Sequence, residues 1–212
     1  MSRLAGCLIA VFALAASPKV APPVSLIAED WWISGAATSL HPAPLVGLSG
    51  WWLDLPVTPN WVSSVDVFYG YPLTGAGALT MTAQVVATSG APEYRYDTES
   101  GNTCVFPAHV RFILYVTGDL SEYGRWWSNP IAYQLSDETV QTKTTPLEPS
   151  AWSDVAGHFG NSSKKAAAQF AGALRKVQWI GLAFGGGCFF SHGVYVANGT
   201  ARFVVTNVQV VP

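Results

Sequence analysis

The sequence predicts an all-β protein, an antiparallel two-sheet β-sandwich with one short helix. Three observations carry this prediction. Apolar residues recur with a period of two over many short segments, and clusters of turn-forming residues such as glycine and asparagine separate these segments. Of the 212 residues, 50% are hydrophobic, which is enough for a sizeable core. Finally, a single segment shows the periodicity of a helix.

Residues 1–16 predict a secretory signal peptide. A positive charge at Arg3 precedes an apolar run from Leu4 to Ala16, and small residues end the run. The run is shorter than the about 20 apolar residues that a membrane-spanning helix needs. We therefore expect a secreted or periplasmic protein without a stable membrane span in the mature chain, with a linker over residues 17–28 and one β-sandwich domain over residues 29–212.

Residues 64–71, 79–88 and 109–116 show the strand pattern most clearly. The side chains expected to point inward are Val65, Val67, Tyr69, Tyr71, Leu79, Met81, Ala83, Val85, Val110, Phe112, Leu114 and Val116. Those expected on the opposite faces are Asp66, Phe68, Thr80, Thr82, Gln84, Arg111, Ile113 and Tyr115. Further strands are expected within residues 131–136, 139–146, 179–186, 189–197 and 200–211.

The exception to this pattern is the stretch of residues 162–177. Its apolar residues fall at helical spacing, at Ala166, Phe170, Leu174 and Val177. Asn161 or Ser162 is the expected N-cap. We therefore expect one short helix, packed on an edge or an end of the sandwich.

The segments "RWWSNPIAYQL", "PLEPSAWSDVAGHF" and "VQWIGLAFGGGCFFSHGVYVANGTARFVVTNVQV" resemble uncharacterised bacterial secreted β-sandwich proteins. A strand with Ile-Gly-Leu-x-Phe that leads to a final alternating strand is similar to galactose-binding-like jelly rolls. The resemblance covers residues 60–212 and implies a jelly-roll sandwich. Because such folds house many carbohydrate-binding modules, it also implies a glycan ligand. Many of these modules take a calcium ligand from a last-strand carboxylate, whereas this chain has Asn207 there, so calcium is not predicted.

The composition bears on the class of partner. Only 11% of the residues are charged, and the formal net charge is -2. Phosphate binding needs a concentrated basic face, so nucleic acid is not an expected partner. The histidines, His41, His109, His158 and His192, lack metal-ligand spacing, and we expect no cofactor or metal.

Paired tryptophans are the most conspicuous candidate binding residues. They stand at Trp31-Trp32, Trp51-Trp52 and Trp126-Trp127. Consecutive residues of a strand point to opposite faces, so each pair should place one ring in the core and one outside it. An indole outside the core must find a covering loop, a partner chain or a ligand. The apolar face of a sugar ring is one such ligand.

The leading hypothesis is therefore a non-catalytic protein that binds a neutral glycan. The candidate carbohydrate-binding residues are Trp126, Trp127, Arg125, Trp52, His192 and Tyr195. One alternative is a structural or protein-interaction domain whose aromatic residues contact a cell-envelope protein. A second alternative is a glycoside hydrolase, which needs a pair of facing carboxylates that the sequence does not locate.

Removal of the signal peptide with Cys7 leaves two cysteines, Cys104 and Cys188. In an oxidising compartment, two remaining thiols predict one disulfide bond between them. The alternative is a nucleophilic Cys188 assisted by His192, four residues further on. The sequence leaves both open.

Overall fold

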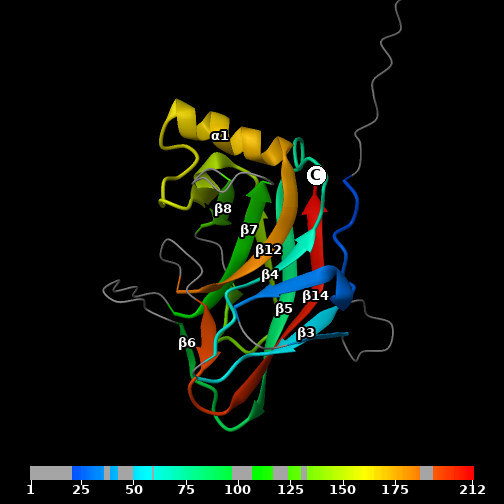
Figure 1. Ribbon diagram of the computed structural model, residues 1–212, viewed down its shortest axis with the longest axis vertical. Coiled ribbons are helices and arrows are strands. Elements are labelled where there is room, and N and C mark those ends of the chain that lie inside the picture. Colours follow the sequence, from blue (N-terminus) through cyan, green and yellow to red (C-terminus); the bar gives the residue numbers. More distant parts are fainter. Residues whose placement is uncertain are drawn as a thin grey trace, which may run out of the picture.

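The computed structural model describes residues 21–35, 39–42, 50–58, 60–96, 107–116, 124–129, 133–186 and 193–212. These residues form an antiparallel β-sandwich with main sheets of seven and five strands. A two-stranded sheet lies at one end of the sandwich and the helix α1 at the other (Figure 1). The predicted fold class is confirmed.

The seven-stranded sheet is antiparallel throughout and has the strand order β1-β4-β12-β7-β8-β11, with β9 paired to β7. Its strands are β1 (Trp31–Ser34), β4 (Ser64–Phe68), β7 (His109–Val116), β8 (Arg125–Ser128), β9 (Tyr133–Gln134), β11 (Trp152–Asp154) and β12 (Val177–Gly185). Strand β1 forms one edge of this sheet, whereas β8 lies between two neighbours.

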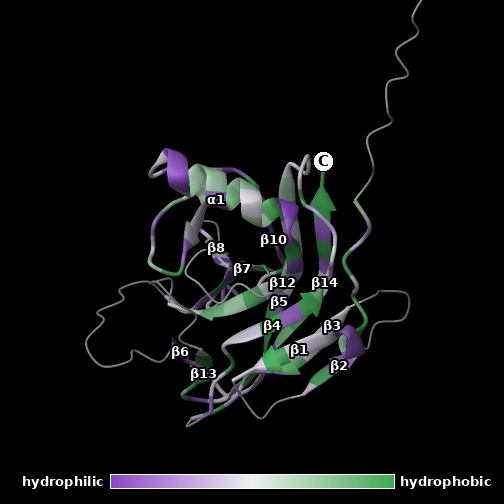
Figure 2. Ribbon diagram, turned by 45° about the horizontal axis from the view of Figure 1, so that its top comes forward, coloured by the Kyte–Doolittle hydropathy of each residue, from purple (hydrophilic) through white to green (hydrophobic). Residues whose placement is uncertain are grey.

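The five-stranded sheet has the order β10-β5-β14-β3-β2. Its strands are β2 (Leu40–Pro42), β3 (Trp51–Asp54), β5 (Ala78–Ser89), β10 (Gln141–Pro146) and β14 (Thr200–Val211). The small sheet pairs β6 (Tyr94–Tyr96) with β13 (Val194–Val196), and the 3-10 turns are η1 (Ala28–Asp30) and η2 (Pro149–Ala151). Over residues 201–206 of β14, buried and half-buried residues alternate, as expected for a strand with one face on the core. Figure 2 shows both hydrophobic and hydrophilic residues along this strand.

The alternating pattern predicted the core on three strands correctly. On β5 and β7 the inward residues Leu79, Met81, Ala83, Val85, Val110, Phe112 and Leu114 are all buried. Val116, at the end of β7, is half-buried against the same core. On β4, Val65 and Val67 are buried as well. The prediction for Tyr71 is wrong, since this side chain is 53% exposed. The strand ends at Phe68, and Gly70, at φ +67°, turns the chain away from the face before Tyr71.

The helix α1 (Lys164–Arg175) packs across one end of the sandwich through Ala166, Phe170 and Ala173. Its N-cap is Ser163, whose hydroxyl accepts a hydrogen bond from the backbone N–H of Ala166 at 3.0 Å. The expected N-cap at Asn161 or Ser162 is therefore wrong by one or two residues. Val177, expected in the helical stripe, begins β12 instead.

Gly172 offers a test of the helix alone. A Cβ placed there would meet only the Arg175 guanidinium, at 3.8 Å. Glycine is about 1 kcal/mol less favourable than alanine inside a helix. We therefore expect Gly172→Ala to raise the free energy of unfolding by about 0.5–1 kcal/mol in urea titrations. An unchanged or lower value would mean that α1 is not helical in solution at this residue.

Several predictions concern residues outside the described part of the chain. Residues 1–20, Cys104, Cys188 and His192 are among them, so the signal peptide, the disulfide bond and the role of His192 stay predictions. No helix in the described ranges is long and apolar enough to cross a membrane.

Candidate functional site

The outer face of the seven-stranded sheet, here called the seven-stranded face, carries an unusual set of side chains. Strand pairing aligns one residue from each of six strands into a row across it. In order across the sheet the row is Trp32, Asp66, Gly181, Ile113, Trp127 and Ser153. Directly opposed residues on neighbouring strands have Cβ atoms about 4.5–5.5 Å apart, so the row is a continuous strip.

Three aromatic side chains at the β1 end of this face form what we call the aromatic patch: Trp32, Phe68 and Trp179. Trp32 is 70% exposed and Phe68 is 60% exposed. The Phe68 and Trp179 rings meet edge to face, with centroids 5.5 Å apart. Among the described residues, no other large hydrophobic side chain is as exposed as Trp32. The patch thus leaves aromatic surface open at the edge of the sheet.

Next to the aromatic patch lies the carboxyl group of Asp66, on the same strand and face as Phe68. Asp66 is only 7% exposed. Its carboxylate rests on the backbone of Gly181, where a Cβ would come within 1.9 Å of Oδ1. Only glycine leaves room for the carboxylate at this position of β12. The position of the Asp66 side chain therefore depends on Gly181, a residue that is distant in the sequence but adjacent in the sheet.

The hydrogen bonds of Asp66 are incomplete. Oδ2 accepts a hydrogen bond from the Ser64 hydroxyl at 2.7 Å, and the Tyr115 hydroxyl donates to the Ser64 oxygen over a long 3.5 Å. Among the described residues, the buried Oδ1 has no partner. A buried acceptor without a partner costs about 1–3 kcal/mol, and such atoms in native proteins call for an explanation.

Burial shifts the proton equilibria of this cluster. It raises the pKa of Asp66 to about 6, although the Ser64 hydrogen bond and the nearby Tyr115 hydroxyl favour the charged form. It also raises the pKa of Tyr115, and the charge of Asp66 acts in the same direction. A carboxyl group with a pKa near 6 changes its charge under mildly acidic conditions. Perturbed groups of this kind concentrate at functional sites.

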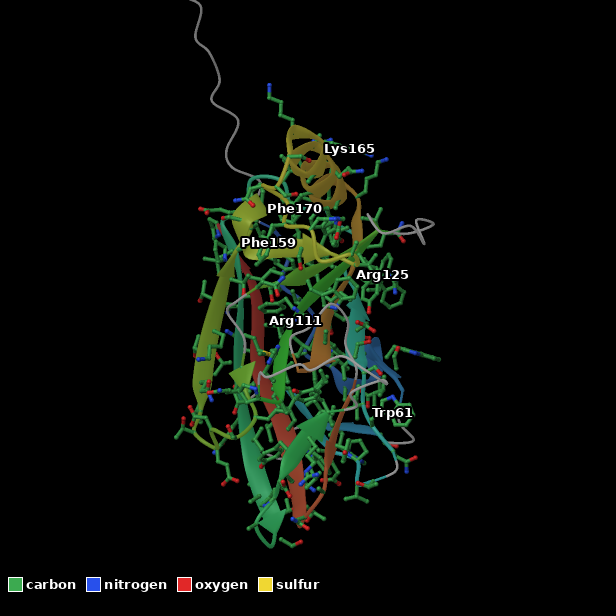
Figure 3. All side chains as sticks on the ribbon, turned by 90° about the vertical axis from the view of Figure 1, so that its left-hand side faces the viewer. Trp61, Arg111, Arg125, Phe159, Lys165 and Phe170 are labelled. Atoms are coloured by element: carbon green, nitrogen blue, oxygen red, sulfur yellow. The ribbon has the colours of Figure 1, made fainter. Side chains whose placement is uncertain are left out.

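A second polar network lies on the same face, beyond Asp66. The Arg111 guanidinium donates to Asn129 Oδ1 at 2.6 Å, and Asn129 Nδ2 donates to the Ser153 hydroxyl at 2.6 Å. Arg111 is 6% exposed, and burial lowers its pKa to about 10. Arg125 lies on the next strand, nearer to the helix, with its Cζ 5.8 Å from the Trp127 ring centroid (Figure 3). Its buried Nε has no partner among the described residues.

The adjacent side chains of Trp126 and Trp127 lie on opposite faces of the seven-stranded sheet. As expected, they point to opposite faces, Trp126 into the main core and Trp127 onto the seven-stranded face beside Ile113 and Ala183. However, the outer ring is not exposed, since Trp127 is 3% exposed and Trp126 is 0% exposed. Of the surroundings considered for the outer ring of a pair, coverage within the chain therefore applies to Trp127. Strand β8 lies inside the sheet, where neighbouring side chains crowd the ring.

Trp52 lies on the other side of the molecule, on the outer face of the five-stranded sheet. His41 of β2 stacks on its ring, with centroids 4.2 Å apart. Arg202 of β14 places its Cζ 3.4 Å from the ring centroid and donates to Asp54 at 3.1 Å. Because β2 and β14 flank β3 on opposite sides, both faces of the indole are occupied within the chain.

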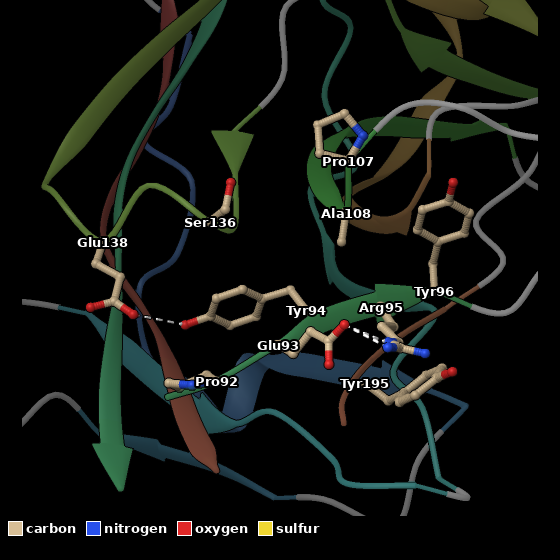
Figure 4. Close-up of a pocket in the computed structure, with 10 residues that line it drawn as sticks. All are labelled: Pro92, Glu93, Tyr94, Arg95, Tyr96, Pro107, Ala108, Ser136, Glu138 and Tyr195. Carbon is tan, nitrogen blue, oxygen red and sulfur yellow. Dashed lines mark hydrogen bonds and ion pairs between the residues drawn. The ribbon is translucent and has the colours of Figure 1, made fainter. Parts of the chain in front are cut away.

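Tyr195 lies in a third place, a hollow of about 590 Å³ beside the two-stranded sheet (Figure 4). Its size is within the range of ligand pockets. The aromatic and charged side chains that line it are Tyr94, Tyr96, Tyr195, Glu93, Arg95 and Glu138. Arg95 pairs with Glu93 at 2.5 Å, and the Tyr94 hydroxyl donates to Glu138 at 3.3 Å. These charged groups are thus already partnered within the chain.

The structure does not bring the predicted residues together in one site. Arg125 and Trp127 belong to the seven-stranded face, Trp52 to the opposite sheet and Tyr195 to the hollow. Sequence reasoning named Trp32 as a member of one tryptophan pair but did not select it, and it missed Phe68, Trp179 and Asp66 as candidate binding residues. A signal was present, because the alternation in residues 64–71 places Asp66 and Phe68 on one face. Trp32 and Trp179 join Asp66 and Phe68 only through the pairing register of β1 and β12 with β4, which the alternation within residues 64–71 does not reveal.

No protein-family model matches the sequence, and no curated protein sequence matches it. Among solved structures, the chain is similar to a family 11 carbohydrate-binding module from Clostridium thermocellum in complex with a β-1,3-1,4-mixed-linked tetrasaccharide. The TM-score is 0.42 at 10% identity, over 86% of this chain and 88% of that chain. It is also similar to a family 12 xyloglucanase from Bacillus licheniformis, with a TM-score of 0.35 at 8% identity over 92% and 98% of the chains. Similarities this remote assign neither a family nor an activity to this protein.

Proposed function

We propose that this protein is an exported, non-catalytic glycan-binding protein and that the sugar binds at the aromatic patch of the seven-stranded face. One observation carries the proposal. Trp32, 70% exposed on an edge strand, stands directly opposite Asp66, whose Oδ1 has no partner within the described part of the chain. An open indole and an unpaired acceptor therefore lie side by side.

This combination suits the chemistry of a sugar ring. Such a ring has an apolar C–H surface on its faces and hydroxyl groups around its edge. Trp32 and Phe68 offer flat apolar surface for the face, and polar groups next to them can meet the edge. Ligand sites generally combine mostly apolar lining with a few well-placed polar groups. The predicted signal peptide supports export to where such glycans occur.

The other two locations are weaker candidates. At Trp52, His41 and Arg202 cover the indole faces that a sugar would need. In the hollow, Glu93 is paired with Arg95 and Glu138 accepts from Tyr94. A ligand there would have to compete with these contacts. At the aromatic patch, by contrast, Trp32 and Phe68 are largely exposed and leave aromatic surface open to a ligand.

Trp32→Ala is the direct test. We expect the purified variant to bind soluble polysaccharide about 30-fold more weakly than the native chain, or not at all. A central aromatic contact contributes about 2 kcal/mol or more to binding, which corresponds to this factor. The measurement is affinity electrophoresis against galactomannan, xyloglucan and mixed-linkage β-glucan. Because Trp32 is largely exposed, its loss should leave the melting temperature nearly unchanged.

Two control variants locate the effect. Trp61→Ala removes a tryptophan that is 41% exposed and is not part of the aromatic patch, and should bind like the native chain. If Tyr195→Ala abolishes binding while Trp32→Ala does not, the site is the hollow and the proposed location is wrong. Absence of binding to every polysaccharide would contradict the glycan proposal and favour the envelope-protein alternative. Release of reducing ends would favour the hydrolase alternative.

A further inference from the structure

The least explained group on the seven-stranded face is the Asp66 carboxyl. Ser64 occupies Oδ2, whereas Oδ1 is shielded from solvent and lacks a partner among the described residues. Oδ1 occupies the space that the absence of a side chain at Gly181 leaves open, since a Cβ there would come within 1.9 Å of it. Among the described residues, Oδ1 of Asp66 is therefore a buried hydrogen-bond acceptor without a donor.

Resting on the proposed glycan binding, we infer that Asp66 determines which sugars the face accepts, by receiving a hydrogen bond at Oδ1 from the ligand. The donor is a hydroxyl or amine at the edge of the sugar that stacks on Trp32. The ligand class is thus a neutral or basic sugar with a free donor at that edge. Sugars whose donors are all substituted, and acidic sugars, bind weakly.

Geometry brings the donor within reach. Trp32 is the direct cross-strand partner of Asp66, so their Cβ atoms are about 4.5–5.5 Å apart. A ring stacked on the indole therefore has its edge beside the carboxyl group. Because Oδ1 is shielded in the free chain, a side chain at the rim must shift to admit the donor. Trp32, exposed and on the edge strand, has the room to do so.

Electrostatics restricts the charge of the ligand. The titratable groups that face the same surface as Asp66 are His109, Arg111 and Tyr115 of β7 and Arg125 of β8, while the outward residues of β1 and β12 are not titratable. Burial and the neighbouring Arg111 charge lower the pKa of His109 to about 4, so this imidazole is neutral at neutral and mildly acidic pH. Arg111 is bonded to Asn129, and Arg125 lies over Trp127. No cation of the described residues forms an ion pair with Asp66. A uronate or sulfate group at this position would therefore meet an uncompensated negative charge.

Binding should respond to pH in a defined direction. A donor at Oδ1 favours the charged carboxylate and so lowers the pKa of Asp66 from its value of about 6 in the free chain. Ligand binding then releases a proton at mildly acidic pH. Affinity should be constant above about pH 7 and fall as the pH drops below about 6.

The test measures affinity from pH 4.5 to 8 for galactomannan, xyloglucan and mixed-linkage β-glucan, with polygalacturonate as the acidic counterpart. We expect Asp66→Asn to bind the neutral polysaccharides at least about 10-fold more weakly at pH 7.5 and to lose the pH dependence. Asp54→Asn, a carboxylate on the outer face of the other sheet, is the matched control and should behave like the native chain. Polygalacturonate should not bind.

Each contrary outcome has a distinct meaning. Native affinity and a native pH profile in Asp66→Asn, together with weak binding in Trp32→Ala, would overturn this inference and leave the proposed function standing. A native chain that binds polygalacturonate more tightly than the neutral polysaccharides would also overturn it. If the native chain binds no polysaccharide at any pH, the proposed function itself fails, and this inference with it. A carbon-13 NMR titration of the Asp66 carboxyl must further show a lower pKa in the presence of saturating polysaccharide, and an unchanged pKa would refute the hydrogen bond.

Discussion

Replacement of Trp126 by alanine is expected to lower the free energy of unfolding by about 3–5 kcal/mol. The Trp126 side chain is 0% exposed and packs edge to face on Phe170 of α1, with ring centroids 5.1 Å apart. Phe170 also contacts Trp152, with centroids 6.0 Å apart. Alanine would leave a cavity where the helix joins the seven-stranded sheet, and close-packed neighbours fill such cavities only partly. The loss should appear as a lower urea midpoint with an unchanged slope.

The control for this variant is Trp61→Ala, which removes a ring that is 41% exposed and should have a much smaller effect. A loss below about 1 kcal/mol for Trp126→Ala would mean that the helix does not pack on this ring. The same variant also separates the two interpretations of the adjacent tryptophans. If Trp126 acts in packing, its loss lowers stability, whereas the residual folded protein still binds polysaccharide.

The second large effect is a gain in stability. Asp66→Asn is expected to raise the free energy of unfolding at pH 7.5 by about 3 kcal/mol. Burial raises the pKa of Asp66 to about 6 in the folded chain, from an ordinary value of 3.8. The folded state therefore binds the proton more tightly, and native stability falls as the pH rises from about 4 to about 6. Above that range the charged form destabilises the fold, and the neutral amide avoids this cost.

Urea titrations at pH 3.5, 5, 6 and 7.5 check this prediction. The difference between variant and native chain should be near zero at pH 3.5 and reach its full size by about pH 7. Asp54→Asn should show no comparable gain, since the Asp54 side chain is 56% exposed. A difference that does not change with pH, or a variant less stable at pH 7.5, would show that the folded chain does not disfavour the Asp66 charge.

The two predicted effects of Asp66 oppose each other: its charged carboxylate lowers the stability of the fold and strengthens glycan binding. The same substitution should stabilise the fold at neutral pH and weaken glycan binding. Residues that destabilise a fold are retained where function requires them, and such conflicts mark functional sites. Gly181 contributes to this arrangement, because its lack of a side chain makes space for the carboxylate.

The local alternation of apolar and polar residues predicted well which side chains of each strand are buried. The alternation on β4, β5 and β7 predicted the inward residues because the period of two is a property of the extended backbone itself. The helical stripe with Phe170 was equally local, and only its ends were misplaced. The prediction that Tyr71 points inward was wrong because the alternating pattern in the sequence continues past Gly70, although the strand ends at Phe68.

The candidate site could be predicted only in part from the local sequence pattern. By itself, the sequence determined the all-β class, the helix, the opposite orientation of the rings within each tryptophan pair, and the common face of Asp66 and Phe68. Only the tertiary structure decided that Trp32 is exposed and Trp127 is buried, although both are the outward rings of identical dipeptides. It also placed Asp66 on Gly181. The physical reason is that a strand's position at the edge or the interior of a sheet, and its register with distant strands, depend on long-range pairing that no local pattern encodes.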